Sequence, residues 1–406
     1  MAGPDDVAVT GLGLVTPGGI GVEPSWAAVL SGRSRAAHDP VLAGNPVSIS
    51  CRVPGFDPAE RLGGRKAHRL DRFVQLALVA AHEAVADAGL DTATWDGARV
   101  GVVIGSAGGG AETFEANHRV LLEENPAWVS PLLLPMHLSN MAAGQVAMEF
   151  GARGPNMVVA TACASGATAI GIAKDLLVMD RCDIVLAGGT EALLNPVTMA
   201  GFARMGALSK RDEALLASRP FDIDRDGFVG AEGAGMMVLE RARDAAAAGR
   251  RVRGRVLGYG ATADAHHVTS PDPGGAGVQA AITAAIAEAG ASASDVVHVN
   301  AHGTSTPLND LVEAQVLGRV LPHRPVVTST KGVTGHMMGA AGAAEAVFSV
   351  LAMEHGVAPP TANTTRLDPR IDIDVAFQAT PVPRGLVLSN SFGFGGQNAV
   401  LAIAAA

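Results

Sequence analysis

Hydrophobic residues occur in two alternating patterns along the chain. Short β-branched runs predict buried strands, and longer stretches with apolar residues three and four positions apart predict helices. The runs that predict strands cover residues 7–10, 100–104, 183–187, 256–260, 296–301, 325–330 and 386–389. The stretches that predict helices cover residues 73–89, 167–177, 279–290 and 339–354. This alternation is typical of an α/β fold with buried parallel strands.

The pattern restarts in the second part of the chain. Residues 242–253 are polar and basic, and a new strand is predicted directly after them. A chain of 406 residues is too long for one simple core. We therefore predict two parts, residues 1–253 and 254–406, as two related halves of one large unit.

The composition narrows the class of protein. Hydrophobic residues make up 48% of the chain, which favours a well-buried globular enzyme. The net charge of −9 argues against nucleic acids and anionic membranes as general partners. No run approaches the ~18 apolar residues of a membrane span, and the first residues do not resemble a signal peptide. Three cysteines form neither a disulfide framework nor a zinc motif, so we expect no metal and a reduced, cytoplasmic setting.

Cys163 is the strongest candidate for chemistry. An apolar segment that includes Val159 leads into small residues around Cys163, and a helical pattern follows from residue 167. The cysteine is therefore expected at a strand-to-helix turn, where the positive end of the helix dipole stabilises a thiolate. Its small neighbours leave room for a substrate carbonyl, so we predict a nucleophile. Cys51 and Cys182 are expected to be core residues.

Other chemistry-bearing residues also follow predicted strands. His302, His336 and the glycine-rich segment 393–396 each come shortly after one. Ligands of open α/β sheets bind beyond the carboxyl ends of the strands. We therefore predict that both histidines share one site with Cys163. His298 lies inside a predicted strand and is expected to be a core histidine.

Two weaker motifs are rejected. The segment 222–227 begins like an EF-hand calcium loop, but Gly233 occupies the twelfth position, where the loop requires glutamate. Gly11 and Gly13, and the glycines near Gly108, do not complete the dinucleotide-binding pattern Gly-x-Gly-x-x-Gly. Neither calcium nor a dinucleotide is therefore an expected ligand.

The candidate residues occur together in one known family. Over nearly its whole length the chain closely resembles the elongating β-ketoacyl-acyl-carrier-protein synthases of the thiolase superfamily. The segments that carry the resemblance are residues 9–13, 161–166, 219–229, 301–306, 331–336 and 390–396. The resemblance implies an acyltransferase with a thiolase-like layered α-β-α-β-α architecture built from two related halves.

The resemblance also implies roles for individual residues. Cys163 would accept an acyl chain from the phosphopantetheine arm of an acyl carrier protein, and no other cofactor would be bound tightly. His302 and His336 would donate hydrogen bonds to the enolate that forms when malonyl-carrier protein loses carbon dioxide. Lys331 and Glu345 would form a pair that keeps the histidines neutral. Phe392 would gate the pocket and share the oxyanion site with Cys163. Thr304 and Thr306 would bind pantetheine, and Gly108 and Phe202 would line the acyl pocket.

A basic run at residues 61–72 has two interpretations. From charge alone it is equally a solvated face or a docking surface for an acidic partner. The resemblance favours docking of the acidic acyl carrier protein, through Arg65, Lys66, Arg69 and Arg72.

Two departures from the fatty-acid enzymes leave the pathway open. Gly108 stands where those enzymes often carry a bulky aliphatic residue, which implies a deeper or differently shaped acyl tunnel. Residues 131–137, at the dimer interface of the family, also differ from theirs. Fatty-acid and polyketide or polyene biosynthesis therefore both stay open, with either a homodimer or a heterodimer containing a chain-length factor.

Three related proteins fit the residues less well. An initiating condensing enzyme has asparagine in place of the second histidine, where this chain has His336. A thiolase needs a second cysteine near its C-terminus, and none follows Cys182. A non-condensing chain-length factor, the principal alternative, lacks the nucleophile that Cys163 would provide.

Overall fold

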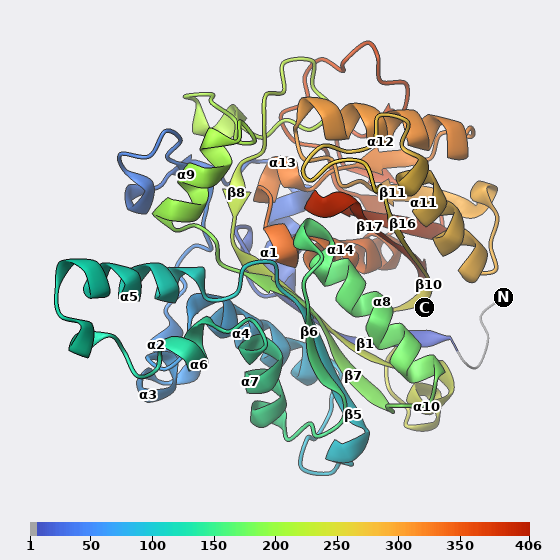
Figure 1. Cartoon of the computed structure of the whole chain (residues 1–406). Coiled ribbons are helices and arrows are strands. Elements are labelled where there is room, and N and C mark those ends of the chain that lie inside the picture. Colours follow the sequence, from blue (N-terminus) through green and yellow to red (C-terminus); the bar gives the residue numbers. More distant parts are fainter. Residues whose placement is uncertain (1–5) are drawn as a thin grey trace.

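The computed structural model describes residues 6–406, so part of the N-terminal segment considered above lies outside the described residues. A mixed twelve-stranded sheet runs through the molecule in the order β14-β12-β11-β16-β17-β10-β1-β9-β7-β5-β6, with β2 paired to β1 (Figure 1). Its strands are β1 (Val7–Thr16), β2 (Gly19–Ile20), β5 (Val100–Gly105), β6 (Asn156–Val159), β7 (Ile184–Glu191), β9 (Gly233–Arg241), β10 (Gly254–Ala263), β11 (Val296–Asn300), β12 (Val326–Thr328), β14 (Asp374–Val375), β16 (Leu386–Gly393) and β17 (Gln397–Ala405).

The two halves of the sheet repeat one strand order. In the first half β6, β5 and β7 are parallel, and β9 and β1 follow as antiparallel strands. In the second half β12, β11 and β16 are parallel, and β17 and β10 follow as antiparallel strands. The predicted α/β architecture of two related halves is confirmed, but the expectation of parallel strands holds for only part of each half. The domain boundary after residue 253 stays a prediction.

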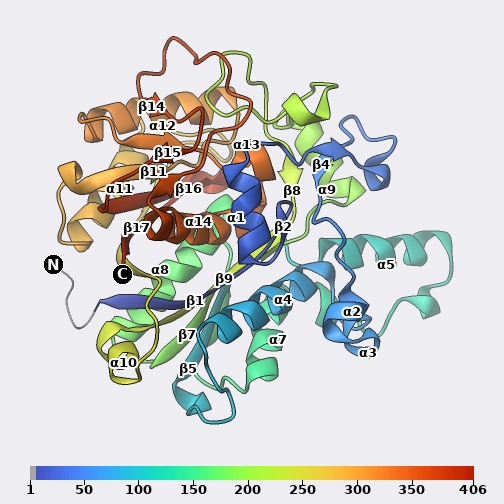
Figure 2. The same ribbon diagram turned by 180° about the vertical axis from the view of Figure 1, so that it is seen from behind.

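Helices cover the sheet in layers (Figures 1 and 2). Helices α8 (Ser165–Val178) and α14 (Ala341–His355) pack between the two halves, and every residue of α14 from Ala341 to Met353 is buried. Helices α4 (Arg72–Asp87) and α7 (Met141–Phe150) cover the outer face of the first half. Helices α11 (Ala276–Glu288) and α12 (Pro307–Val320) cover that of the second. The central helices thus have sheet on both sides.

Close backbone contact joins the two central helices. A Cβ atom on Gly166 would lie 2.7 Å from the main-chain nitrogen of Ala343, and one on Gly342 would lie 2.9 Å from that of Ala167. Both separations are far shorter than a van der Waals contact, so only glycine fits at these two positions. Glycine and alanine in this layer therefore allow the backbones of α8 and α14 to approach each other closely.

The shorter elements lie outside these layers. The other helices are α1 (Val22–Leu30), α2 (Pro58–Leu62), α3 (Gly64–Ala67), α5 (Ala111–Glu123), α6 (Leu133–His137), α9 (Pro196–Arg204), α10 (Ala242–Ala247) and α13 (Lys331–Thr334). The short strands are β3 (Ala37–His38), β4 (Ile49–Cys51), β8 (Gly230–Ala231), β13 (Val357–Ala358) and β15 (Thr380–Pro381). Among residues 6–406, no helix has the length and apolar character needed to cross a membrane.

Candidate active site

Cys163 lies on a strained turn between β6 and α8. Ala162, directly before it, has a φ of 49°, in the left-handed region that non-glycine residues rarely adopt. Two hydrogen bonds hold this turn: the Ser165 hydroxyl donates to the Ala162 carbonyl at 2.6 Å, and the Thr161 N–H donates to the Ser165 oxygen at 2.9 Å. The cysteine therefore stands at the N-terminal end of α8, as the sequence predicted.

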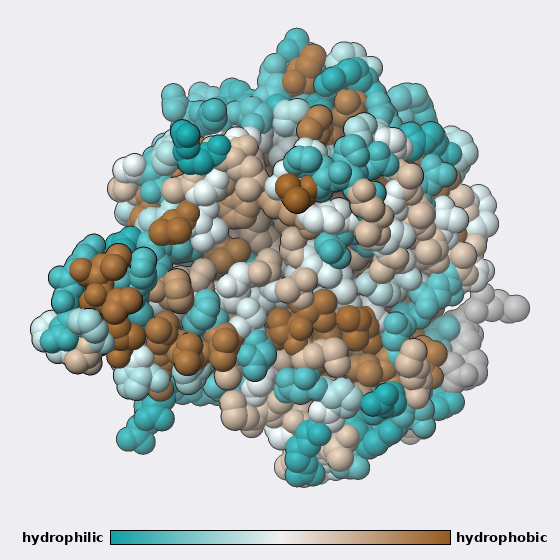
Figure 3. Space-filling view, viewed as in Figure 1, coloured by the Kyte–Doolittle hydropathy of each residue, from teal (hydrophilic) through white to brown (hydrophobic). Residues whose placement is uncertain are grey.

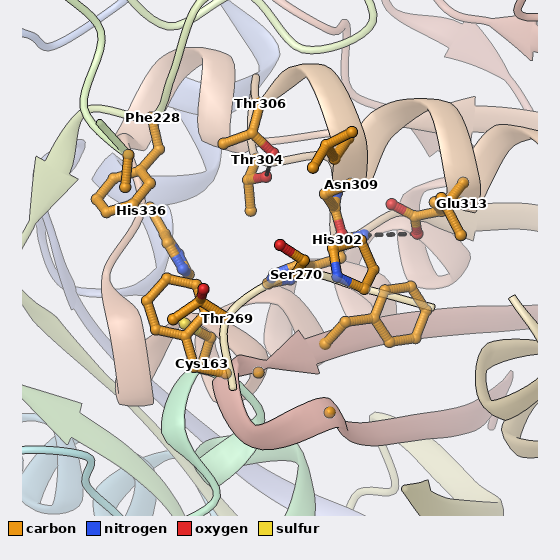
Figure 4. Close-up of a pocket in the computed structure, with 18 of the residues that line it drawn as sticks. Cys163, Phe228, Thr269, Ser270, His302, Thr304, Thr306, Asn309, Glu313 and His336 are labelled. Atoms are coloured by element: carbon orange, nitrogen blue, oxygen red, sulfur yellow. Dashed lines mark hydrogen bonds between the residues drawn. The ribbon is translucent and has the colours of Figure 1, made fainter. Parts of the chain in front are cut away.

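A single cavity of about 340 Å³ brings the predicted residues together. Figure 4 shows Cys163 and His336 on one side of this cavity, His302 across from them, and Thr304 above the space between. The predicted site residues that line it are Cys163, Phe202, His302, Thr304, Thr306, His336 and Phe392. These residues come from both halves of the chain, so the site forms only where the halves meet.

His302 and His336 face each other at the ends of two neighbouring strands. Their ring centroids are 5.4 Å apart and the ring planes are inclined by 83°. Burial lowers the pKa of both imidazoles well below 6.5, and the nearby Lys331 ammonium lowers it further. Both rings are therefore neutral near pH 7. Their Nδ1 atoms are buried without a hydrogen-bond partner among the described residues, so a proton on Nε2 would give each ring a donor for a ligand.

Lys331 forms a buried ion pair with Glu345. Lys331 begins α13 directly after β12, and its Nζ atom lies 2.5 Å from Oε1 of Glu345 on α14. Burial raises the pKa of the Glu345 carboxyl to about 7, although Lys331 lowers it. The pairing implied by the family resemblance is thus present, and its cation is close enough to lower the histidine pKa values.

Glu313 anchors the loop that carries His302. The main-chain N–H groups of His302 and Gly303 each donate to this carboxylate at 2.8 Å, and the amide of Asn390 donates at 3.0 Å. Glu313 lies on α12 and is buried. Sequence reasoning missed this residue, although a glutamate on the same helix face as Val316 and Leu317, three and four positions on, is a signal for a buried acceptor.

The second N–H group near the Cys163 sulfur comes from a residue two positions further along the chain than expected. The main-chain N–H groups that point to the sulfur of Cys163 are its own and that of Phe394. Phe392 is still within β16, where it pairs with Asn398, whereas Phe394 begins the turn that follows. Phe394 rather than Phe392 therefore presents its N–H group to the sulfur, and the oxyanion role of this group stays a proposal. The Phe392 ring does line the cavity, 5.6 Å from the His302 ring.

Gly393 lets this turn approach Cys163 closely. A Cβ atom at this position would lie 2.5 Å from the carbonyl oxygen of Thr161 and 3.1 Å from the main-chain nitrogen of Cys163. Any side chain would push the turn away from the cysteine. Gly393 therefore fixes the distance between the Phe394 N–H group and the sulfur.

Cys163 is a thiol in the unliganded protein. Burial raises its pKa to about 12; Lys331 and the two N–H groups lower it, and the Glu191 carboxylate raises it. The helix N-terminus alone predicted a thiolate. Burial outweighs that effect in the structure, because a thiolate loses more solvation than these donors restore.

Aromatic rings form one wall of the cavity. Phe202 contacts Phe228 edge-on with a centroid distance of 5.4 Å, and Phe228 contacts His336 at the same distance with the planes at 89°. Phe228 was not predicted as a site residue. On another side, the hydroxyls of Thr304 and Thr306 lie 2.8 Å apart, and both threonines line the cavity.

Gly108 does not line this cavity within the described part of the chain. A Cβ atom at Gly108 would lie 2.5 Å from a methyl group of Leu193. Leu193 is buried and fills the space that a larger residue at position 108 would take. The effect of Gly108 on the shape of the acyl tunnel therefore stays a prediction.

The four predicted docking residues fall into two groups. Arg65 and Arg69 are exposed on and just after α3. Lys66 pairs with Glu149, and Arg72 makes two hydrogen bonds of 2.6 and 2.7 Å to the buried carboxylate of Glu232. Recruitment of Arg72 by a partner would expose that carboxylate, so the structure favours a structural role for Arg72, and docking through the four residues stays a prediction.

Comparisons with known proteins agree with this geometry. Residues 4–245 match the family described as beta-ketoacyl synthase, N-terminal domain, and residues 253–365 match its C-terminal domain. The 3-oxoacyl-(acyl-carrier-protein) synthase 2 of Synechocystis sp. is 41% identical over 405 residues, which cover 98% of this chain and 97% of that protein. The protein of the same name from Staphylococcus aureus is 41% identical over 402 residues, with 97% of each chain covered.

Solved structures give the same result. The ishigamide ketosynthase/chain length factor has a TM-score of 0.93 at 33% identity and covers 99% of both chains. A type II polyketide synthase acyl-carrier protein in complex with its ketosynthase, bound to the hexaketide, gives a TM-score of 0.92 at 32% identity over the full length of both chains. Together with the cysteine and histidine pair at one cavity, these matches show that the chain belongs to the β-ketoacyl synthase family.

Proposed function

We propose that this chain catalyses the decarboxylative condensation of an acyl group with malonyl-acyl-carrier protein. The observation that carries the proposal is a cysteine on a strained turn, with two neutral histidines and two N–H donors around a single cavity. A nucleophile, an oxyanion site and a separate pair of enolate donors are the three components that such a reaction needs.

Cys163 carries the acyl group in the first step. Its sulfur attacks the thioester carbonyl of an acyl-carrier protein, and the N–H groups of Cys163 and Phe394 stabilise the resulting oxyanion. The carrier thiol leaves and takes up the proton that Cys163 loses. The products are an acyl-cysteine thioester and the free carrier protein.

His302 and His336 act in the second step. Malonyl-carrier protein places its thioester oxygen between the two Nε2 donors, and the bond to the carboxylate breaks with release of carbon dioxide. The bonding electrons form an enolate, which the two neutral imidazoles stabilise. Phe228 and Phe202 give this part of the cavity an apolar wall, which favours loss of the charged carboxylate.

Carbon–carbon bond formation completes the cycle. The enolate carbon attacks the acyl carbonyl on Cys163, and the same two N–H groups hold the second oxyanion. The sulfur then leaves as a thiolate and regains a proton. The product is a β-ketoacyl-carrier protein that is two carbons longer than the acyl group loaded.

Substrates reach the cavity on a phosphopantetheine arm. Thr304 and Thr306 present neighbouring hydroxyls on the cavity wall, where they fit the amides of this arm. Arg65 and Arg69 carry exposed positive charge for the acidic carrier protein. We propose that the enzyme works with carrier proteins of the cytoplasm and that no tightly bound cofactor takes part.

A second subunit completes the assembly in this proposal. Figure 3 shows an apolar band that extends from α5 across to α8 on one face. Large exposed apolar residues on these and the intervening segments of the chain include Phe114 and Leu121 on α5, Leu134 on α6 and Val178 on α8. Bands of this extent mark protein interfaces. Either a second copy of this chain or a chain-length factor would cover it, for fatty-acid or polyketide synthesis respectively.

The experiment that tests the function is intact-mass analysis after incubation with acyl-carrier protein. We expect one acyl adduct on the wild type and none on Cys163→Ala. His302→Ala and His336→Ala should still acquire the adduct but lose condensation by a factor of about 10² to 10³, because each removes one enolate donor. An unacylated wild type with every carrier-bound chain would overturn the proposal. The chain-length-factor alternative predicts that result.

A further inference from the structure

Glu191, the last residue of β7, is a buried carboxylate that the reaction above does not use. It has no exposed surface and accepts four hydrogen bonds. The donors are the N–H groups of Ala107 at 2.6 Å, Gly108 at 3.2 Å and Gly339 at 3.2 Å, and the hydroxyl of Ser106 at 3.1 Å. Glu191 therefore joins the loop after β5 to the turn before α14.

The turn before α14 forms part of the cavity wall. Met338 lines the cavity and has a φ of 46°, a strained value for this residue type. Gly339 follows it, and a Cβ atom there would lie 2.5 Å from Oε2 of Glu191. The carboxylate thus occupies the space that a side chain at position 339 would need, and it accepts a hydrogen bond from the N–H group of Gly339, beside the strained Met338.

The repeated strand order gives this arrangement a counterpart. Strand β7 corresponds to β16, and the turn before α14 corresponds to the turn before α8 that carries Cys163. Ala162, with φ 49°, precedes Cys163 as Met338, with φ 46°, precedes Gly339. The Gly339 N–H group is thus the equivalent of the Cys163 N–H group in the oxyanion site. The Glu191 carboxylate accepts the N–H group in the turn before α14, as an oxyanion would accept the N–H group in the turn before α8.

Glu191 also acts on Cys163 through its charge. Its carboxylate raises the pKa of the Cys163 thiol, after the larger effect of burial. Burial raises the pKa of Glu191 itself to about 7, against its four donors. The charges that act on the thiol are those of Glu191 and the Lys331 ammonium, together with the N–H groups of Phe394 and Cys163. Titratable side chains that share its cavity include His302 and His336, which are neutral near pH 7.

We propose that Glu191 is a positioning residue of the condensing site, which fixes Met338 and Gly339 against the loop after β5. The positioning role in condensation rests on the proposed function. The effect on the thiol does not depend on it, because it concerns the unliganded protein.

The first test measures alkylation of Cys163 by iodoacetamide, followed by intact mass between pH 6 and pH 9. Glu191→Gln removes the charge at nearly constant volume, so its thiol should react about tenfold faster than wild type at pH 8. At pH 6 the wild-type carboxyl is largely protonated, and the two rates should converge. The matched control is Glu240→Gln, a buried carboxylate on β9 that binds Thr10 and Arg250.

The second test separates position from charge. Glu191→Asp keeps the carboxylate but shortens its reach, so alkylation should match wild type while the condensation kcat falls about tenfold or more. Equal alkylation rates for wild type and Glu191→Gln at every pH would overturn the charge effect. An unchanged kcat in Glu191→Asp would overturn the positioning role. If wild type cannot be acylated by any carrier protein, the proposed function fails, but the alkylation comparison still tests Glu191.

Discussion

The Nζ atom of Lys331 lies 2.5 Å from Oε1 of Glu345, and each side chain is only 1% exposed. The pair links the strand end near His336 to the central helix α14. Its cation lowers the pKa of His302, His336 and Cys163. One buried ion pair therefore influences the protonation of every group proposed to take part in the reaction.

Replacement of Lys331 should affect stability and activity separately. Lys331→Met leaves Glu345 without its cation, which should lower the free energy of unfolding by about 3 kcal/mol at pH 8. The loss should be smaller at pH 6, because the pKa of Glu345 is already raised to about 7 and the carboxyl can then be protonated. Urea unfolding at the two pH values measures this difference. Lys331→Met/Glu345→Leu should regain stability without regaining condensation; recovery of both would contradict an electrostatic role.

Gly393→Ala should impair acylation of Cys163. The added methyl group would meet the Thr161 carbonyl and push the Phe394 N–H group away from the sulfur. We expect the rate of acyl transfer from the carrier protein to fall at least tenfold, measured by the time course of the mass adduct. Gly144→Ala on α7 is the control, because a Cβ atom there has no neighbour within 4 Å. A normal acylation rate in Gly393→Ala would show that this close approach is dispensable.

Charge reversal should distinguish docking residues from structural ones. Arg65→Glu/Arg69→Glu changes exposed charges and should raise the KM for carrier protein several-fold, with little change in Tm. Arg72→Ala should instead lower the free energy of unfolding by about 3 kcal/mol, because it leaves the buried Glu232 carboxylate poorly paired. Thermal unfolding and steady-state kinetics on both variants test this. The division fails if Arg72→Ala is as stable as wild type.

His298 should contribute a defined pH dependence to stability. Burial lowers its pKa from 6.5 to about 3, so below pH 6.5 the unfolded chain binds a proton that the folded chain does not. Its contribution to stability is therefore lost as the pH falls from 6.5 towards 3. Between pH 7 and pH 5, wild type should lose about 2 kcal/mol more than His298→Gln, in which position 298 does not titrate. Urea unfolding measures this difference. An equal loss of unfolding free energy in the two proteins would mean that His298 takes up a proton in the folded state, which would contradict the prediction.

The sequence predicted those site residues that follow strands. Cys163, His302 and His336 each come after a predicted strand, and the carboxyl ends of parallel strands meet at one edge of a sheet. Local pattern was sufficient for these residues, because the fold itself brings such ends together. The same pattern correctly located the helices α4, α8, α11 and α14.

Residues whose role depends on distant contacts were not predictable in this way. Phe394 rather than Phe392 supplies the N–H group because the strand pairing continues to Gly393, which depends on β17. Leu193 fills the space beside Gly108, although 85 positions separate them in sequence. Glu313 and Glu191 act through main-chain donors from other elements. No local periodicity contains this information.

The glycine contacts between α8 and α14 have a consequence for the whole site. Within residues 6–406, β1 and β10 join the two halves of the sheet through three residue pairs. Cys163 belongs to one half, and both histidines belong to the other. The distance from sulfur to imidazole is therefore governed by how closely two helix backbones approach at Gly166 and Gly342. A backbone separation cannot be relaxed by a change of rotamer. A single methyl group at Gly166 or Gly342 would thus change the distance between the sulfur and the imidazoles without contacting any reacting group.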